Sequence, residues 1–159
     1  MIIRTVTPKD LEAVTALEAA AFPPAEAAPI TAFRYRIEAF PERFFVAEEE
    51  GRIIGMINGC ASSLDAIVDE LFQPGGHEAD GQNQMIFGLA TAPDRRNEGI
   101  ASALMNHMID FCRESGMKKI ILTCKEALIP FYRRFGYVNE GISASVHGGA
   151  VWYDMVIML

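Results

Sequence analysis

The stretch MIFGLATAPDRRNEGIASALMNHMIDFC, residues 85–112, decides the fold of this 159-residue chain. An apolar strand over 85–91 leads into a polar turn over 92–99, and a helix follows from residue 100. The helix has two adjacent apolar rows, which are Ile100, Leu104 and Met108, and Ala101, Met105, Ile109 and Cys112. A helix N-terminus has unpaired N–H groups and a partial positive charge, so a strand–turn–helix unit of this kind can bind phosphate.

The turn before the helix has the residue types that a phosphate site needs. Small residues near Gly99 and Ala101 let a pyrophosphate approach the backbone closely, and Arg95 and Arg96 add positive charge. The Walker-type loop and the G-x-G-x-x-G dinucleotide fingerprint are both absent from the sequence. Judged from these residues alone, the stretch fits a pyrophosphate loop and also fits an ordinary turn that ends in a helix cap.

Outward from this stretch, strands and helices are mixed along the chain, with hairpins near both ends. We expect further strands over 2–6, 44–48, 53–60, 119–124, 137–146 and 151–158, and further helices over 8–21, 31–40 and 126–135. Proline-rich and glycine-rich loops separate them at 22–29 and 73–83. The pattern predicts one domain over residues 1–159, of the α/β (α+β) class with a mixed sheet.

Composition and charge exclude several classes of protein. The chain is 50% hydrophobic and 22% charged, which is typical of a globular protein, and its net charge of −7 argues against a general nucleic-acid binder. No apolar run approaches the ~20 residues of a membrane span, and the N-terminus has no signal-peptide stretch. Cys60, Cys112 and Cys124 are odd in number and far apart, which predicts reduced, buried thiols in a cytoplasmic protein without a metal site.

At Arg96-x-x-Gly99-x-Ala101 the sequence resembles the acyl-CoA pyrophosphate motif of the GNAT acetyltransferases, and the resemblance extends over the whole chain. Within this family the chain is most similar to the arylalkylamine (serotonin) N-acetyltransferases. Residues 124–137, CKEALIPFYRRFGY, follow the last strand–helix unit of that group, and Glu18 before a proline-rich loop fits its N-terminal part.

The resemblance implies a GNAT acyltransferase fold, with a mixed, mostly antiparallel sheet that is flanked by helices and splayed between its fourth and fifth strands. Acetyl-CoA would lie in the gap, and its pantetheine would pair like a strand with the backbone of Leu89, Ala90 and Thr91. A backbone N–H near Leu89 or Ala90 would stabilise the oxyanion of the reaction. The residues expected to bind acetyl-CoA are Leu89, Ala90, Thr91, Arg95, Arg96, Asn97, Glu98, Gly99, Ile100, Ala101 and Ser102.

The reaction that the resemblance implies is direct transfer of the acetyl group to an amine in a ternary complex. Tyr132 matches the family tyrosine that protonates the departing thiolate, although an aromatic residue that only packs is the alternative. The histidines of the arylalkylamine group are replaced by Met85 and Phe87, so the base is either missing or lies elsewhere. Glu18 and Glu26 flank the loop that shapes the amine pocket in this family, and each is a candidate to hold the ammonium group or relay its proton.

Weaker candidates complete the set. Asp69, Glu70, His77 and His147 are each more easily explained as surface residues, and Cys124 is more easily explained as a packed thiol than as an acetyl carrier. The leading hypothesis is an acetyl-CoA-dependent N-acetyltransferase for a small primary amine. The alternatives are a peptide or protein amine, polyamine or aminoglycoside acceptor, or a non-catalytic acyl-CoA sensor. A homodimer through the terminal hairpin at 151–153 is also open.

Overall fold

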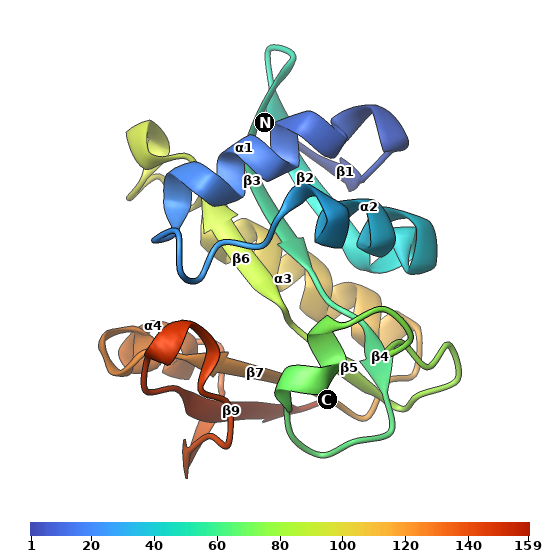
Figure 1. Cartoon of the computed structure of the whole chain (residues 1–159), viewed down its shortest axis with the longest axis vertical. Helices are drawn as coiled ribbons and strands as arrows, with labels where there is room; N and C mark the ends of the chain where they lie inside the picture. Colours follow the sequence, from blue (N-terminus) through green and yellow to red (C-terminus); the bar gives the residue numbers. More distant parts are fainter. The chain divides into compact units, whose positions relative to one another are not determined.

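A computed structural model describes all residues, 1–159. The chain forms two compact units, and each unit is assembled from two separate segments. The first unit contains residues 1–59 and 87–110, and the second contains residues 60–86 and 111–159. Figure 1 gives the labels of the elements.

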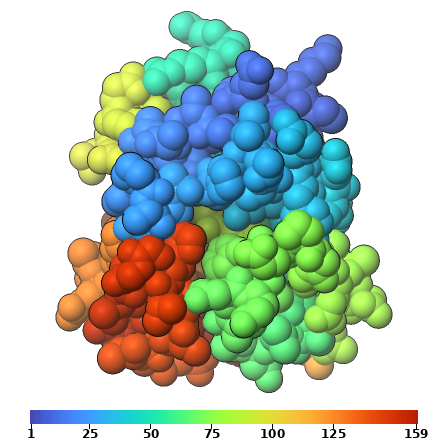
Figure 2. Space-filling model, viewed as in Figure 1, coloured from blue at the N-terminus to red at the C-terminus, as the bar shows by residue number.

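The first unit contains an antiparallel sheet in the order β1-β2-β3-β6. Its strands are β1 (Ile2–Thr5), β2 (Phe44–Glu49), β3 (Arg52–Asn58) and β6 (Gly88–Thr91). The turn between β2 and β3 has positive φ at both central residues, 50° at Glu50 and 77° at Gly51, which suits the right-handed twist of a two-residue hairpin. This turn is the teal tip at the top of Figures 1 and 2.

Helices cover both faces of this first sheet. Figure 1 shows α1 (Leu11–Ala21) and α2 (Ile30–Ala39) in front of the sheet and α3 (Ile100–Glu114) behind it. Short 3-10 turns precede α1 (η1, Pro8–Asp10), follow α2 (η2, Pro41–Arg43) and lead toward α3 (η4, Pro93–Arg95). The N–H of Thr7 donates to the Asp10 carboxylate at 2.8 Å, and Arg4 donates two hydrogen bonds to the same group. These contacts fix the start of the first helix.

Close packing of α3 against β3 depends on a glycine. A Cβ atom on Gly55 would lie 2.8 Å from Cγ2 of Ile100 and 2.9 Å from Cδ1 of Leu104, so a side chain at this position would require these two side chains of α3 to shift. The core of the unit includes fully buried aromatic and aliphatic side chains, among them Val14, Phe33, Phe40, Phe44, Ile54 and Met56.

The second unit contains a five-stranded sheet in the order β4-β5-β7-β9-β8. Its strands are β4 (Ala61–Ser62), β5 (Asn83–Met85), β7 (Lys119–Cys124), β8 (Val138–Ile142) and β9 (Tyr153–Met158). Only β5 and β7 are parallel, so the sheet is mixed. Its other elements are η3 (Asp69–Phe72), η5 (Glu126–Leu128), α4 (Ile129–Arg133) and η6 (His147–Gly149).

The α/β class with mixed sheet and flanking helices is confirmed, but two details of the prediction are wrong. The strand predicted over 85–91 is two strands, β5 and β6, which belong to different sheets. The helix predicted over 126–135 is a 3-10 turn followed by the five residues of α4. The chain therefore has two sheets instead of one, with β6 in the first and β7 in the second. That residues 1–159 form one domain stays a prediction.

All three cysteines are buried and free, as the sequence predicts. The longest helix, α3, has 15 residues, and none of the helices combines the length and apolarity that crossing a membrane requires.

Candidate active site

The break between β5 and β6 lies at Ile86 and Phe87. The N–H of Ile86 donates to the carbonyl of Ile121 in β7, whereas the N–H of Phe87 donates to the carbonyl of Asn58 in β3. Two successive residues thus bond to strands of different sheets. Periodicity cannot reveal this change because the apolar run continues through it.

The strand β6 is an edge strand of the first sheet, because β3 is its only neighbour there. The N–H of Ala92 donates to Ile54 at 2.9 Å, and Ala90 is paired with Met56 in the same register. Since N–H directions alternate along a strand, the N–H groups of Leu89 and Thr91 point away from β3. Of the three residues expected to pair with pantetheine, Leu89 and Thr91 therefore direct their N–H groups to the open edge, while Ala90 directs its N–H toward β3.

The loop between β6 and α3 has a specific backbone shape. Asn97 and Gly99 have φ values of 64° and 83°, a region that favours glycine and is tolerated by asparagine. Helix α3 begins directly after Gly99. The first N–H groups of a helix have no partner within it, so those of Ile100, Ala101 and Ser102 are suited to an anionic ligand.

The charged side chains of this loop are mostly committed to one another. Arg95 donates to both carboxylate oxygens of Glu98, at 3.0 and 2.9 Å, and to Glu49 at 3.0 Å. Arg52 donates two hydrogen bonds to Asp94, at 2.9 and 2.7 Å, and these lower the pKa of Asp94 to about 2. Arg96 is exposed, and none of the loop's ion pairs involves it. The structure thus leaves Arg96 available for a phosphate and uses Arg95 to brace the loop.

The two predicted acceptor-site glutamates differ in their surroundings. Glu18, near the end of α1, is 5% exposed, and its Oε2 accepts the N–H of Ala28 at 2.9 Å. This bond ties the proline-rich loop back to the helix. Glu26 lies in that loop and is half-buried. Glu18 is therefore the more deeply buried of the two carboxylates.

Tyr132 lies in α4 of the second unit and is 7% exposed. Its ring packs edge-on against the rings of Phe131 and Tyr137, at centroid distances of 5.0 and 5.7 Å. Burial, and then the neighbouring Cys124, raise the pKa of Tyr132 well above the ordinary value of a tyrosine, so its hydroxyl keeps its proton at neutral pH. Burial also raises the pKa of the Cys124 thiol to about 11, which opposes a role as nucleophile because a thiolate is required.

The weaker candidates have structural contacts within the second unit. Nδ1 of His77 accepts the N–H of Ala61 at 3.2 Å, and His147 stacks on Phe72 at 5.6 Å. The carboxylate of Asp69 accepts the hydroxyl of Ser145 at 2.6 Å. These contacts hold the segment that contains Asp69 and His77, and the segment that contains Ser145 and His147, within the second unit.

Two buried polar residues of the first unit form a pair that the sequence analysis did not predict. Arg36 and Asn58 are 4% and 0% exposed, and Arg36 donates to Asn58 at 3.0 Å. Sequence signals for them exist, since Arg36 lies among the apolar residues of its helix and Asn58 ends an apolar strand. Neither signal says that the two side chains meet.

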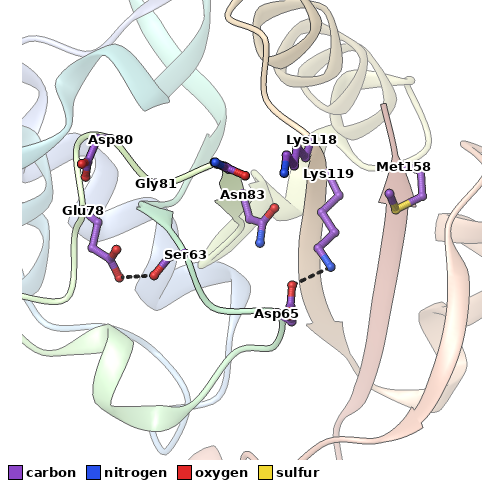
Figure 3. A pocket seen from close by; sticks show the side chains of 10 residues that line it. Ser63, Asp65, Glu78, Asp80, Gly81, Asn83, Lys118, Lys119 and Met158 are labelled. Carbon is purple, nitrogen blue, oxygen red and sulfur yellow. Dashed lines mark hydrogen bonds and ion pairs between the residues drawn. The ribbon is translucent and has the colours of Figure 1, made fainter.

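A pocket of about 400 Å³ lies in the second unit, and Figure 3 shows the side chains around it. Its charged lining includes an ion pair between Lys119 and Asp65 at 2.8 Å, and Ser63 donates to Glu78 at 3.1 Å. None of the predicted site residues lines this pocket. We therefore assign it no part in the reaction.

Comparison with known proteins identifies the family of this chain. The sequence profile of the acetyltransferase (GNAT) family matches residues 11–137. Serotonin N-acetyltransferase of Mesocricetus auratus is 26% identical over 96% of this chain and 74% of that protein. The probable hydrolase YhcX of Bacillus subtilis is 28% identical over 85% of this chain, which spans only 27% of YhcX.

Among solved structures, the loading GNATL domain of CurA from Lyngbya majuscula has a TM-score of 0.87 at 16% identity, with 99% of this chain and 96% of that chain covered. At that identity the likeness shows the fold alone. The family profile covers most of the chain, including β6, the following loop and α3. This chain therefore belongs to the GNAT family of acetyltransferases, as residues 96–101 and 124–137 indicated.

Proposed function

We propose that this GNAT acetyltransferase transfers the acetyl group of acetyl-CoA to a small primary amine. The observation that carries the donor half of the proposal is the open edge of β6 followed by a positive-φ loop and the N-terminus of α3. The N–H of Thr91 pairs with pantetheine, that of Leu89 faces the thioester carbonyl, and those from Asn97 to Ser102 bind the pyrophosphate. Arg96 adds a cation to the phosphates.

The proposed chemistry is one displacement without an acyl-enzyme. The amine nitrogen attacks the thioester carbonyl, and the N–H of Leu89 stabilises the developing oxyanion. As the C–S bond breaks, the hydroxyl of Tyr132 protonates the departing thiolate of CoA. The amide nitrogen loses its second proton, which restores the hydroxyl of Tyr132. In total one N–C bond forms, one C–S bond breaks, and one proton of the original ammonium ion goes to solvent.

The acceptor half rests on Glu18 and on the acidity of the chain. A buried carboxylate beside the proline-rich loop, in a protein with a net charge of −7, favours a cationic acceptor over an anionic one. Glu26, half-buried in the same loop, supplies a second negative charge. Arylalkylamines are the first class to test, since the hamster relative is named a serotonin N-acetyltransferase.

Release of CoA thiol from acetyl-CoA tests the proposal. The panel contains arylalkylamines, polyamines, aminoglycosides and short peptides, and binding of acetyl-CoA is measured in parallel by calorimetry. Release with a small primary amine supports the proposal. Release only with peptides, polyamines or aminoglycosides replaces the acceptor class, and tight acetyl-CoA binding without release for any amine favours a non-catalytic acyl-CoA sensor.

A further inference from the structure

Three buried polar side chains converge in the first unit from three different elements. They are Glu18 of α1, Arg36 of α2 and Asn58 of β3, with exposed fractions of 5%, 4% and 0%. Taking a carboxylate and a guanidinium out of water is costly unless both are held by suitable partners. Their burial beside the strand β6 therefore needs an explanation.

Arg36 is held by two aromatic rings and one amide. Its Cζ lies 5.1 Å from the ring centroid of Phe33 and 5.1 Å from that of Phe87, so the guanidinium makes cation–π contacts with both rings. Its Nη1 donates to Oδ1 of Asn58 at 3.0 Å. The guanidinium of Arg36 is thus held next to the amide oxygen of Asn58.

The amide of Asn58 has its direction set by this bond. Because Oδ1 accepts from Arg36, Nδ2 points to another side, where it is buried and has no hydrogen-bond partner. A Cβ atom on Gly88 would lie 3.6 Å from this Nδ2 and 3.7 Å from Oε1 of Glu18. The positive end of the amide and the carboxylate therefore face the same space beside Gly88.

Gly88 is not explained by backbone geometry. Its φ is outside the positive region, and a side chain there would make contacts of ordinary length. This distinguishes it from Gly55, where a side chain would collide with α3. A side chain at residue 88 would instead cover Nδ2 of Asn58 and Oε1 of Glu18. Residue 88 directly precedes Leu89.

We infer that Arg36 and Asn58 are positioning residues that hold Glu18 ionised beside Gly88, where its carboxylate binds the acceptor as an ammonium ion and takes one N–H proton. This inference rests on the proposed function. The proton passes from the ammonium nitrogen to a carboxylate oxygen and is later released to solvent, which returns Glu18 to its ionised form. The nitrogen lone pair becomes free to attack the thioester. Arg36, acting through the oriented amide of Asn58, stabilises the ionised carboxylate before the transfer.

Other charged groups near Glu18 are few. The elements packed against α1 are η1, α2, β3 and β6. Lys9 and Asp10 of η1 lie at the opposite end of α1, the only charged residue of β3 is Arg52 at its exposed start, and β6 has none. On α2, Arg34 and Glu38 are exposed and Tyr35 is half-buried, while Glu26 lies in the loop after α1. Arg36 is the one buried cation among these groups.

The test is the pH dependence of kcat/KM for amine acetylation. Arg36→Met keeps an unbranched side chain between the rings and removes the charge. We expect its acidic limb to move to higher pH by about one unit, because an ionised Glu18 loses stabilisation, while the Kd of acetyl-CoA stays unchanged. Arg36→Lys should recover most of the shift. Two acceptors of different pKa should give the same limb, which assigns it to the enzyme and not to the amine.

Control and second variants keep the test decisive. Arg34→Met removes an exposed cation from the same helix and should leave the profile unmoved. Asn58→Asp keeps an oxygen for Arg36 and replaces the N–H end with negative charge, so its limb should also move upward, even if Arg36→Met fails to fold. Acetylation with an unmoved limb in both Arg36→Met and Asn58→Asp would overturn this inference alone. No acetylation of any amine by the wild-type protein would overturn the proposed function and this inference together.

Discussion

Gly99 and Gly116 flank the same helix, α3, and both have a left-handed backbone, with φ values of 83° and 73°. At neither position would a Cβ atom meet another atom within 4 Å. Alanine at either position therefore costs only backbone strain, of about 1–2 kcal/mol. The two ends differ in chemistry, because Gly99 precedes the N-terminal N–H groups and Gly116 follows the C-terminal end of the helix.

This pair separates ligand binding from stability. We expect Gly99→Ala and Gly116→Ala to lower the free energy of unfolding by similar amounts. Only Gly99→Ala should weaken acetyl-CoA binding, by about tenfold, because the strained loop no longer directs its N–H groups at the pyrophosphate. Urea unfolding and titration calorimetry measure the two effects. Equal Kd values for the two variants would remove the loop from the donor site.

Tyr132→Phe should lower kcat by about 100-fold with an unchanged Kd for acetyl-CoA, since general acids typically contribute about 10²–10⁴-fold. The pKa of Tyr132 is raised by burial, so the hydroxyl stays protonated well into the alkaline range. Wild-type turnover should consequently show no loss from tyrosine ionisation between pH 7 and about 9. Tyr137→Phe is a matched control, because Tyr137 is another buried tyrosine whose ring packs against Tyr132. Equal turnover of both variants would leave Tyr132 a packing residue.

Cys124→Ala should retain most of the activity. With a pKa of about 11, the thiol is almost entirely protonated at neutral pH and cannot attack the thioester. Mass spectrometry of the wild-type protein after incubation with acetyl-CoA alone should show no added acetyl group. An acetyl adduct that is absent from Cys124→Ala would instead point to a two-step, ping-pong reaction.

The contact between Arg4 and Asp10 predicts how stability depends on pH. Hydrogen bonds from Arg4 lower the pKa of Asp10 below 3.8, so its contribution is present above that pH and is lost as pH falls through the lower folded value. Asp10→Asn should lower the free energy of unfolding by about 1–2 kcal/mol at pH 7, with the difference shrinking below pH 4. Urea unfolding at several pH values measures this, and Asp110→Asn, at an exposed position, serves as the control. A difference that is constant from pH 7 to 3 would contradict the assignment.

Residues 85–91 show where sequence analysis stops. The strand–loop–helix order and the family motif are local, so they could be predicted from neighbours along the chain. The break at Ile86 and Phe87 could not, because it is a change of hydrogen-bond partner, from Ile121 to Asn58, in an unbroken apolar run. The pairing of Arg36 with Asn58 was missed for a related reason. They are 22 residues apart, and only folding makes them a hydrogen-bonded pair.

The loop charges illustrate the same limit. Arg95 and Arg96 look equivalent in sequence, and both were expected to serve the phosphates. The structure distinguishes them, because Glu98 and Glu49 both engage the guanidinium of Arg95 while Arg96 stays exposed. Glu98 is a near neighbour, but Glu49 is 46 residues away from Arg95 along the chain, so that contact depends on the fold.

Burial of every native thiol has a practical consequence for spectroscopy. Cys60, Cys112 and Cys124 are all inaccessible, so a maleimide dye should react with a single added surface cysteine without removal of the native ones. The β2–β3 turn is a suitable place, since Glu50 is exposed at its tip. A fluorophore there would be attached at one defined position while all three native cysteines stay in place.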